Sequence, residues 1–566
     1  MVTVDPITLE VARNRLEAIA DDMGIVLRRT SYSPNIKERA DCSAALFNPA
    51  GEMLAQAEHI PVHLGSMPAS VSAVLDHLGD RMGPGEQAIV NDPFAGGTHL
   101  NDITLVAPCF ERPDGGRLIG WVANRAHHAD VGGSAPGSIP ADATDIHAEG
   151  LRIPPVLLTD DVRAMLAANS RTPVERSGDL EAQVGANAVG VARLAELADA
   201  DFAAVLDHGE RRCRSVLGAV IDGGAGSRSV EAHDVLDSTG AERDQRGSAT
   251  IRVTVTMEPG AASDAADELD RAGPSVTFDF TGTDPQRWGN TNAVRAVTVS
   301  SVAYALRAAL DPTLPANDGV MRPVRVVTEP GSLVDARAPV AVGAGNVEVS
   351  QRVADVCQLA LAELLPGRVP AAGQGTMNNL LIGGEGASDR GGTGDVHGDD
   401  AGAGGADSGG PWVYYETTGG GQGGRPPDPS QPGARPVQGQ SGIHTAMTNT
   451  RNTPIEALER AYPMRVLRCT LRRGSGGAGM APGGDGIERD LLMLEDVTVS
   501  LITERRVSAP WGLQGGEAGA VGENWLLPGG DESLAERLDD KCTLRLVAGD
   551  VLRVLTPGGG GWGAAS

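Results

Sequence analysis

Residues 91–133 read NDPFAGGTHL NDITLVAPCF ERPDGGRLIG WVANRAHHAD VGG, and this stretch decides the fold of the N-terminal part of the chain. Two apolar runs, 103–106 and 118–122, are separated by the turn residues PDGG at 113–116. Short apolar runs on either side of such a turn predict a β-hairpin. Polar clusters stand at the outer ends of both strands, so we expect a sheet that presents polar side chains at one end.

The hairpin brings three potential metal ligands together. His99 and Asp102 stand at the start of the first strand and His127 at the end of the second, and a hairpin returns the chain to its origin. Two imidazoles and one carboxylate leave coordination positions open, as in catalytic sites, and mixed nitrogen and oxygen donors suit Mn²⁺, Fe²⁺ or Zn²⁺. His128 and Asp130 either orient a ligand imidazole or are alternative ligands. The alternative interpretation is that backbone hydrogen bonds alone satisfy these polar side chains.

Histidine is concentrated around this hairpin. Seven of the eleven histidines precede residue 150: His59, His63, His77, His99, His127, His128 and His147. His59 and His63 are four residues apart, but Pro61 between them argues against a helical metal-binding face. We interpret both as the lining of a pocket. The residues expected to bind substrate there are His59, His63, Asp92, Arg125 and Glu149.

Composition excludes several classes of protein. Of the 566 residues, 41% are apolar and 21% charged, which is ordinary globular usage and unlike a disordered, collagen-like or coiled-coil chain. A net charge of −27 repels phosphate backbones, so no nucleic-acid partner is expected. No segment approaches the roughly 18 apolar residues that span a bilayer, and the N-terminal residues lack a signal-peptide pattern. We therefore expect no membrane partner and a cytoplasmic location.

The periodicity of apolar residues predicts a mixed α/β (α+β) fold of several layers, with mixed or antiparallel sheets. The expected elements are helices over 6–29, 66–82, 178–220 (one long helical segment), 300–310 and 350–365, and strands over 88–90, 103–106, 118–122, 250–257 and 276–280. A glycine-rich linker at 222–229 marks the first domain boundary. The expected regions are a metal and active-site region (1–222), a mixed α/β core (230–383), a low-complexity surface loop (384–410) and a β-rich C-terminal region completing the core (411–566).

Glycine and cysteine carry weaker signals. The glycine runs 419–424 and 474–479 lack the lysine of a nucleotide-binding P-loop and the strand-to-helix context of a dinucleotide fingerprint. We interpret them as tight turns near an active site. The six cysteines lie far apart without a CxxC pair, which predicts buried reduced thiols rather than a zinc ribbon or a disulfide scaffold.

Nearly the whole chain resembles the B-type chains of the hydantoinase/oxoprolinase family. This family includes the B-type chain of N-methylhydantoinase, the C-terminal part of 5-oxoprolinases and, more distantly, the alpha subunit of acetone carboxylases. The motifs that carry the resemblance include DPITLEVARNRLEAIADDMG (5–24), SYSPNIKERADCS (31–43), HIPVHLGSMPAS (59–70), NDPFAGGTHLNDITLVAP (91–108), WVANRAHHADVGG (121–133), GNVEVSQRVADV (345–356), QGTMNNL (374–380) and MTNTRNTPIEALE (447–459).

The resemblance implies a division of labour between two subunits. A partner hydantoinase A-type subunit with an actin-like fold uses ATP and Mg²⁺ to activate the substrate carbonyl by phosphorylation, and the B-type subunit hosts the subsequent chemistry. In the acetone carboxylase branch a His-x-x-Asp pair and a later histidine hold a metal, typically manganese. These positions fall on His99, Asp102 and His127, whereas His128 matches a position that is not a histidine there. The segment around His444 lacks a second histidine that many relatives have, and 384–410 looks like an insertion.

The expected function is that of a B-type subunit of a hetero-oligomeric, ATP-dependent hydrolase of cyclic amides such as hydantoin, N-methylhydantoin or 5-oxoproline. A metal at His99, Asp102 and His127 would polarise the carbonyl and lower the pKa of water toward about 7. His128 or Asp130 is expected to position or deprotonate that water. An acetone-carboxylase-like alpha subunit and a non-catalytic scaffold subunit remain alternatives.

Overall fold

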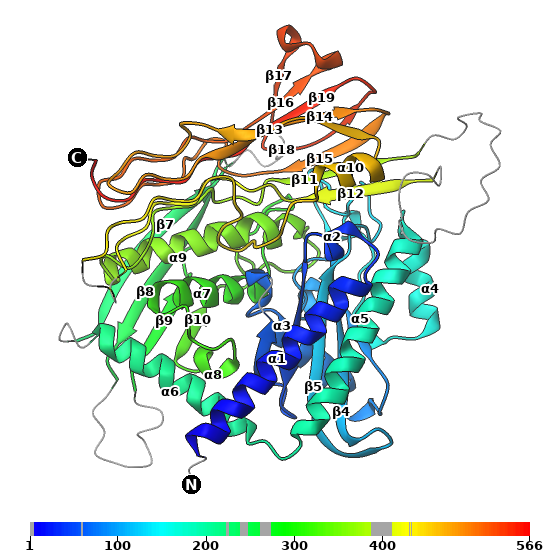
Figure 1. Ribbon diagram of the computed structural model, residues 1–566, viewed down its shortest axis with the longest axis vertical. Coiled ribbons are helices and arrows are strands. Elements are labelled where there is room, and N and C mark those ends of the chain that lie inside the picture. The colour runs from blue at the N-terminus through cyan, green and yellow to red at the C-terminus, as the bar shows by residue number, and fades with distance from the viewer. Residues whose placement is uncertain are drawn as a thin grey trace.

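The structure, a computed structural model, describes residues 5–57, 60–221, 226–237, 247–260, 273–386, 410–428, 431 and 433–565. The described strands form four sheets, one of six strands, one of five and two of four, with helices packed around them (Figure 1). Antiparallel pairs dominate and one pair is parallel, so the predicted mixed α/β fold class is confirmed. No helix in this described part of the chain is long and apolar enough to cross a bilayer.

The six-stranded sheet contains the predicted hairpin. The strands are antiparallel in the order β2-β1-β5-β4-β3-β6. Pairing of β4 with β5 places Asp102 opposite His127 at one end and Arg112 opposite Gly115 at the turn, which confirms the hairpin. The strands of this sheet are β1 (Cys42–Phe47), β2 (Met53–Ala57), β3 (Ala88–Val90), β4 (Asp102–Arg112), β5 (Gly115–His127) and β6 (Val156–Leu157).

Helices cover both faces of this sheet because successive strand residues point to opposite sides. On β1, Leu46 packs with Leu16 and Met23 of α1, while the next residue, Phe47, packs with Met67 of α3. α5 also lies along β4 and β5 (Figure 1). The helices around this sheet are α1 (Pro6–Thr30), α2 (Pro34–Lys37), α3 (Met67–Leu78), α4 (Asp160–Asn169), α5 (Pro173–Leu194) and α6 (Phe202–Ile221).

The helical segment expected over 178–220 is two helices rather than one. α5 ends at Leu194, a single 3-10 turn follows at Ala195–Leu197, and α6 begins at Phe202. The Asp201 carboxylate accepts the backbone N–H of Ala204 at 3.0 Å. An aspartate in this position starts a new helix, because it satisfies an N–H group that has no partner within the helix. The break allows the chain to turn, and α6 packs beside the central sheet.

The central part contains a four-stranded sheet, ordered β10-β9-β8-β7, the helices α7 and α9, which pack on each other, and the short helix α8. α9 lies against β7 and β8 and is buried on nearly every side. A π-helical turn, Gly345–Val349, leads directly into it. The elements of this part are β7 (Arg228–Leu236), β8 (Ala249–Glu258), β9 (Ser275–Asp279), α7 (Arg295–Leu310), α8 (Asp318–Met321), β10 (Val324–Val327) and α9 (Ser350–Leu364).

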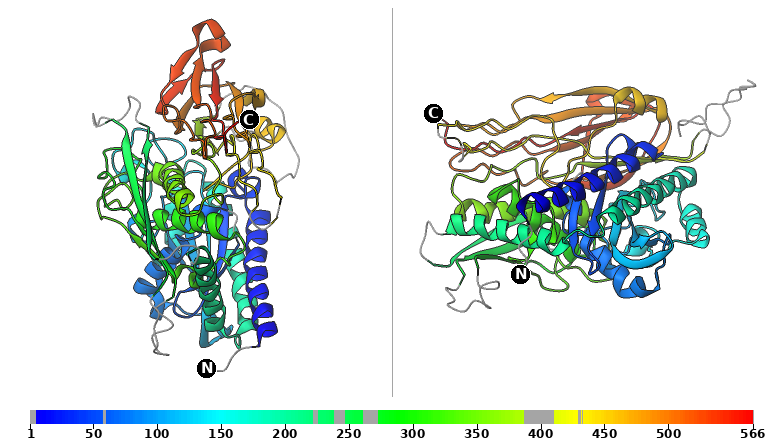
Figure 2. Two further views of the ribbon diagram at one scale, coloured as in Figure 1. Left: turned by 90° about the vertical axis from the view of Figure 1, so that its left-hand side faces the viewer. Right: turned by 60° about the horizontal axis from the view of Figure 1, so that its bottom comes forward.

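The C-terminal part contributes two more sheets, ordered β12-β11-β15-β18 and β13-β14-β19-β16-β17. Figure 2 shows these strands as a layer stacked on one side of the N-terminal and central parts. The elements are β11 (Asn379–Gly384), β12 (Trp412–Glu416), α10 (Ile455–Ala461), β13 (Met464–Arg472), β14 (Gly486–Met493), β15 (Val497–Ile502), β16 (Glu523–Leu527), β17 (Glu536–Leu538), β18 (Lys541–Leu546) and β19 (Val551–Leu555).

Most of the residues in the glycine runs do not form tight turns, which corrects our interpretation; only the start of the second run, at Gly474 with φ +78°, lies in a turn. The other residues of the runs lie in irregular or extended segments whose backbones touch one another. A Cβ atom on Gly421 would lie 2.0 Å from the carbonyl oxygen of Gly484, and one on Gly559 would lie 2.1 Å from that of Gln422. Gly559 also donates to the Gly484 carbonyl and accepts from the Gly477 N–H. Glycine is required here because no side chain fits between backbones at this spacing.

Two further expectations concern the domain division and the cysteines. The proposed division into four regions stays a prediction, and residues 222–225 of the linker and 387–409 of the loop lie outside the described residues. All six cysteines are free thiols. The expected burial is wrong for Cys469, which is exposed on β13, and for Cys542, which is half-buried on β18.

Candidate metal centre

The site is built at the end of the hairpin. Asp102 is the first residue of β4 and His127 the last of β5, and the turn at 98–101 brings His99 beside them. The side-chain ligand atoms of His99, Asp102 and His127 lie within 4.8 Å of one another, and all three residues are buried. Convergence of these side chains is the geometry that a shared metal ion requires.

The two oxygens of Asp102 have different surroundings. Oδ2 accepts from Thr98 Oγ1 at 2.6 Å and from Asn346 Nδ2 at 3.1 Å. Oδ1 lies 3.1 Å from His99 Nε2 and 3.4 Å from His127 Nδ1, yet it makes no hydrogen bond. Both ring nitrogens of His99 and Nε2 of His127 are also buried without a hydrogen-bond partner. Buried polar atoms without partners are costly, and a divalent cation would satisfy these, so the residues present fit a metal.

The electrostatics of the three residues are coupled. Burial lowers the pKa of His127 to about 3, which keeps its imidazole neutral and able to bind a metal. Burial also opposes protonation of His99, but the adjacent Asp102 carboxylate outweighs it and raises the His99 pKa. Burial would raise the pKa of Asp102, yet contacts with His99, His127 and His63 hold it well below its usual value. Asp102 is therefore an anion at neutral pH.

A series of side-chain contacts that involves all three parts of the chain supports His127. The Tyr415 ring stacks on the His127 imidazole, with centroids 4.5 Å apart and planes 14° from parallel. The Tyr415 hydroxyl donates to Asn379 Oδ1 at 2.9 Å, and Asn379 Nδ2 donates to Glu348 Oε1 at 2.8 Å. Arg39 lies against the Tyr415 ring, with its Cζ 4.8 Å from the centroid. These side-chain contacts fix the plane of the His127 imidazole, as outer contacts of metal ligands do.

The π-helical turn Gly345–Val349 connects the metal centre with the contacts that support His127. It carries Asn346, which binds Asp102, and Glu348, which binds Asn379. Single π turns inside α-helices occur frequently at functional sites. Sequence reasoning missed Asn346, Glu348 and Tyr415. Only the motif GNVEVSQRVADV pointed to the first two residues, without indicating what they contact.

Asp41 is a further residue that sequence reasoning missed. It immediately precedes β1, and its backbone carbonyl accepts the N–H of His127 at 3.0 Å. Its carboxyl is buried beside the cluster, and burial together with the Asp102 charge raises its pKa to about 7. The only sequence signal was its place in the motif SYSPNIKERADCS.

The structure brings two of the expected pocket residues to the cluster. His63 Nε2 lies 3.5 Å from Asp102 Oδ2, while His63 Nδ1 lies 2.9 Å from Ser43 Oγ. Glu149 accepts the backbone N–H of Gly343 at 2.7 Å, and its charge acts on His99. Burial raises the Glu149 pKa to about 7. His59 lies outside the described residues.

The other expected residues have partners elsewhere. His128 Nε2 lies 2.9 Å from Gln183 Oε1 on α5, and Asp130 pairs with Arg171, Oδ1 to Nη1, at 2.8 Å. Asp92 caps the short turn after β3 by accepting the N–H of Phe94 at 3.0 Å. Arg125 is buried, and its guanidinium donates to Thr104 Oγ1 at 2.9 Å, Ser66 Oγ at 2.6 Å and Ser70 Oγ at 2.7 Å. These contacts tie β5 to β4 and to α3.

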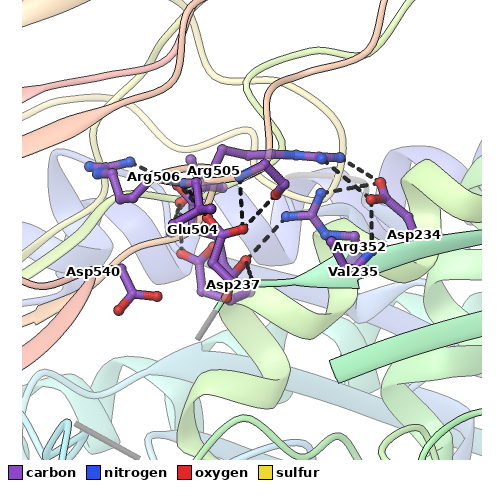
Figure 3. Close-up of polar contacts among 12 residues, drawn as sticks. Asp234, Val235, Asp237, Arg352, Glu504, Arg505, Arg506 and Asp540 are labelled. Atoms are coloured by element: carbon purple, nitrogen blue, oxygen red, sulfur yellow. Dashed lines mark hydrogen bonds and ion pairs between the residues drawn. The ribbon is translucent and has the colours of Figure 1, made fainter. Parts of the chain in front are cut away.

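A buried network of ion pairs lies where the central and C-terminal parts meet (Figure 3). Arg505 Nη2 lies 2.7 Å from both Asp234 Oδ2 and Asp355 Oδ2, and Arg352 Nη2 lies 3.2 Å from Glu504 Oε2. Buried charges are tolerated only when paired in this way. The members are Asp234, Asp237, Arg352, Asp355, Glu504, Arg505, Arg506, Asp540 and Lys541. The network fixes the segment that follows β15 against β7 and α9.

Comparisons with known proteins give a consistent picture. The model of the family described as "Hydantoinase B/oxoprolinase" matches residues 5–565. The chain is 35% identical to 5-oxoprolinase 1 of Arabidopsis thaliana over 99% of this chain and 42% of that protein. It is 29% identical to the B-type chain of a putative D-/L-hydantoinase of Pseudomonas sp. strain NS671 over 99% of this chain and 90% of that protein. The chain spans about 40% of the length of the 5-oxoprolinases it matches.

Two solved structures share the fold. The ATP-dependent caprolactamase of Pseudomonas jessenii aligns with a TM-score of 0.80 and 26% identity, over 99% of this chain and 92% of that one. A nucleotide-free acetone carboxylase aligns with a TM-score of 0.80 and 19% identity, over 99% of this chain and 76% of that one. The second likeness concerns the fold alone.

Proposed function

The chain belongs to the hydantoinase B/oxoprolinase family, and we propose that it supplies the ring-opening site of an ATP-dependent hydrolase of cyclic amides. The observation that carries this proposal is the convergence of His99, Asp102 and His127, with ligand atoms within 4.8 Å of one another. A site with three protein ligands and open positions is catalytic in type.

We propose Mn²⁺ as the metal at this site, with Fe²⁺ or Zn²⁺ as alternatives, because the donors are two nitrogens and one oxygen. When bound, such an ion supplies Lewis acidity toward an amide carbonyl and lowers the pKa of water. Residues of the chain hold and orient the ligands of this ion. Thr98 and Asn346 hold one oxygen of Asp102, which directs the other toward the imidazoles. Tyr415 holds the His127 ring in place.

Asp41 and Glu149 are our candidates for moving protons during ring opening. Burial raises the pKa of each carboxyl to about 7, so each can take up or release a proton near neutral pH. We assign positioning roles to His128 and Asp130, whose partners are Gln183 and Arg171. They follow His127 closely in the chain and anchor the end of β5.

A cyclic amide is favoured over a ketone as the substrate. The 5-oxoprolinase, hydantoinase and caprolactamase relatives are 35%, 29% and 26% identical to this chain, whereas the acetone carboxylase is 19% identical. We therefore propose a hydantoin or a 5-oxoproline-like ring. A carboxylation reaction remains an outcome that the assay below can reveal.

We also propose an A-type partner that handles ATP and Mg²⁺ in a hetero-oligomer. The hydantoinase relative of similar length is itself one chain of a multi-subunit enzyme, and the 5-oxoprolinases extend well beyond the region that this chain matches.

The test is reconstitution with an A-type subunit of the family. Purified together with ATP and Mn²⁺, the two chains should hydrolyse hydantoin, 5-oxoproline or ε-caprolactam, and Asp102→Asn should abolish turnover. ATP-dependent consumption of acetone and bicarbonate, with no hydrolysis of any ring, would contradict the proposal.

A further inference from the structure

A pair of buried carboxamides in the segment before β11 has an unused donor and an unused acceptor. Gln374 and Asn378, from the motif QGTMNNL, are 0% and 1% exposed. Asn378 Nδ2 donates to Gln374 Oε1 at 2.9 Å and to the Thr418 carbonyl at 3.1 Å. Because a carbonyl oxygen can only accept, these bonds fix the orientation of both amides. Gln374 Nε2 and Asn378 Oδ1 are left without partners.

The backbone around the pair is held in an unusual conformation. Asn378 has φ +49°, in the left-handed region, and Gly375 has φ +62°. Such residues cluster at functional sites, where the surroundings hold them in place. A Cβ atom on Gly375 would lie 2.6 Å from Arg505 Nε and 2.8 Å from Asp355 Oδ2, so the ion-pair network lies directly behind this backbone. Figure 3 shows Arg505 within that network.

The amide pair is built against the same elements as the metal centre. The next residue, Asn379, binds Tyr415, which stacks on His127. Within the same segment, the Thr376 hydroxyl lies 3.1 Å from Glu348 Oε1, on the π-helical turn. The segment that carries the carboxamide pair is therefore linked to the metal centre through two contacts, Asn379 with Tyr415 and Thr376 with Glu348.

Glycine residues make room for the amides. A Cβ atom on Gly420 would lie 2.1 Å from Gln374 Oε1, and one on Gly373 would lie 2.8 Å from Thr445 Oγ1. Thr445 Oγ1 is a third buried polar atom without a partner. Buried polar atoms without partners cost free energy unless a bound group satisfies them.

We propose that Gln374 and Asn378 bind the amide group of the cyclic substrate. Gln374 Nε2 donates a hydrogen bond to the ring carbonyl, and Asn378 Oδ1 accepts one from the ring N–H. A ring amide has its N–H and C=O on the same side, so a donor and an acceptor on neighbouring carboxamides complement it. This inference rests on the proposed function and names the part of the site that recognises the ring.

The test compares two variants of the chain reconstituted with its A-type partner. Gln374→Met removes the free donor at similar volume. Gln56→Met is the matched control, because the Gln56 carboxamide is also buried with both polar atoms unpaired, but on β2 at the edge of the N-terminal sheet. Steady-state kinetics are measured with hydantoin, 5-oxoproline and ε-caprolactam.

We expect Gln374→Met to raise KM at least tenfold with a smaller change in kcat, and Gln56→Met to leave both unchanged. An unchanged KM in Gln374→Met with an active wild type overturns this inference and leaves the proposed function standing. Equal effects of the two substitutions also overturn it. No turnover of any ring by the wild-type assembly overturns the proposed function, and the inference with it.

A second measurement needs no variant. In the wild-type assembly, 2-pyrrolidinone should inhibit at least ten times more strongly than N-methyl-2-pyrrolidinone, because the methyl group removes the N–H that Asn378 would accept. Equal inhibition by the two compounds contradicts the assignment.

Discussion

Replacing Asp102 with asparagine should remove the metal while leaving the fold in place. The amide oxygen can still accept from Thr98 and Asn346, which now bond to Oδ2 at 2.6 and 3.1 Å. The amide nitrogen then takes the place of Oδ1, 3.1 Å from His99 Nε2 and 3.4 Å from His127 Nδ1. The metal would therefore lose its negatively charged ligand and face an uncharged N–H group instead.

The expected loss of metal affinity is at least about 100-fold, because even outer contacts of metal ligands are worth 10- to 100-fold. This corresponds to about 2.7 kcal/mol or more. The assay is metal content by mass spectrometry after dialysis, together with the rise in Tm on adding Mn²⁺. Asp490→Asn is the control, since Asp490 is also buried but pairs with Arg553 in the C-terminal part. Stoichiometric metal in Asp102→Asn, or loss of metal in Asp490→Asn, would refute the assignment.

Three further predictions test other parts of the structure. Burial raises the Glu348 pKa to about 8. As the pH rises, the unfolded state therefore loses this proton before the folded state does, and the free energy of unfolding of the wild type falls between about pH 5 and 8. Glu348→Gln should therefore gain stability over the wild type across this window, by up to about 1.4 kcal/mol per pH unit, and a constant difference in denaturant unfolding would contradict the shift. Gly559→Ala should lower the free energy of unfolding by about 3 kcal/mol or more, because its Cβ would meet the Gln422 carbonyl. Gly185→Ala, on α5 with open space around it, is the control and should be neutral or stabilising. Equal Tm values for the two variants would show that the segments containing Gly559 and Gln422 are not close-packed. Tyr415→Leu should weaken metal binding about tenfold by freeing the His127 ring, and an unchanged Kd for Mn²⁺ in calorimetry would count against that support.

The local parts of the fold could be predicted because their signals are local. The turn at 113–116 and the apolar runs beside it lie within 20 residues and determine the hairpin. The same short range brings His99, Asp102 and His127 together, because strand pairing places Asp102 opposite His127. The helix break at 195–201 was missed because one aspartate, Asp201, decides it, and the apolar periodicity continues on both sides.

The rest of the site depends on contacts between distant residues. Asn346 reaches Asp102 across 244 positions, and Tyr415 stacks on His127 from the C-terminal part. A single sequence does not show which distant segments meet, so the motif that contains Asn346 did not reveal its partner, and Tyr415 lies in none of the motifs. The glycine run 419–424 was misread for the same reason, since Gly421 and Gly484 are 63 residues apart, and only the packed backbones show why both are glycine.

The measurement that tests the central claim most directly is a crystal structure of the protein grown with Mn²⁺, with anomalous diffraction recorded to locate the ion. The account predicts one anomalous peak within about 2.3 Å of Asp102 Oδ1 and of one ring nitrogen each of His99 and His127. A fully occupied manganese peak elsewhere, with these three side chains unligated, would contradict it.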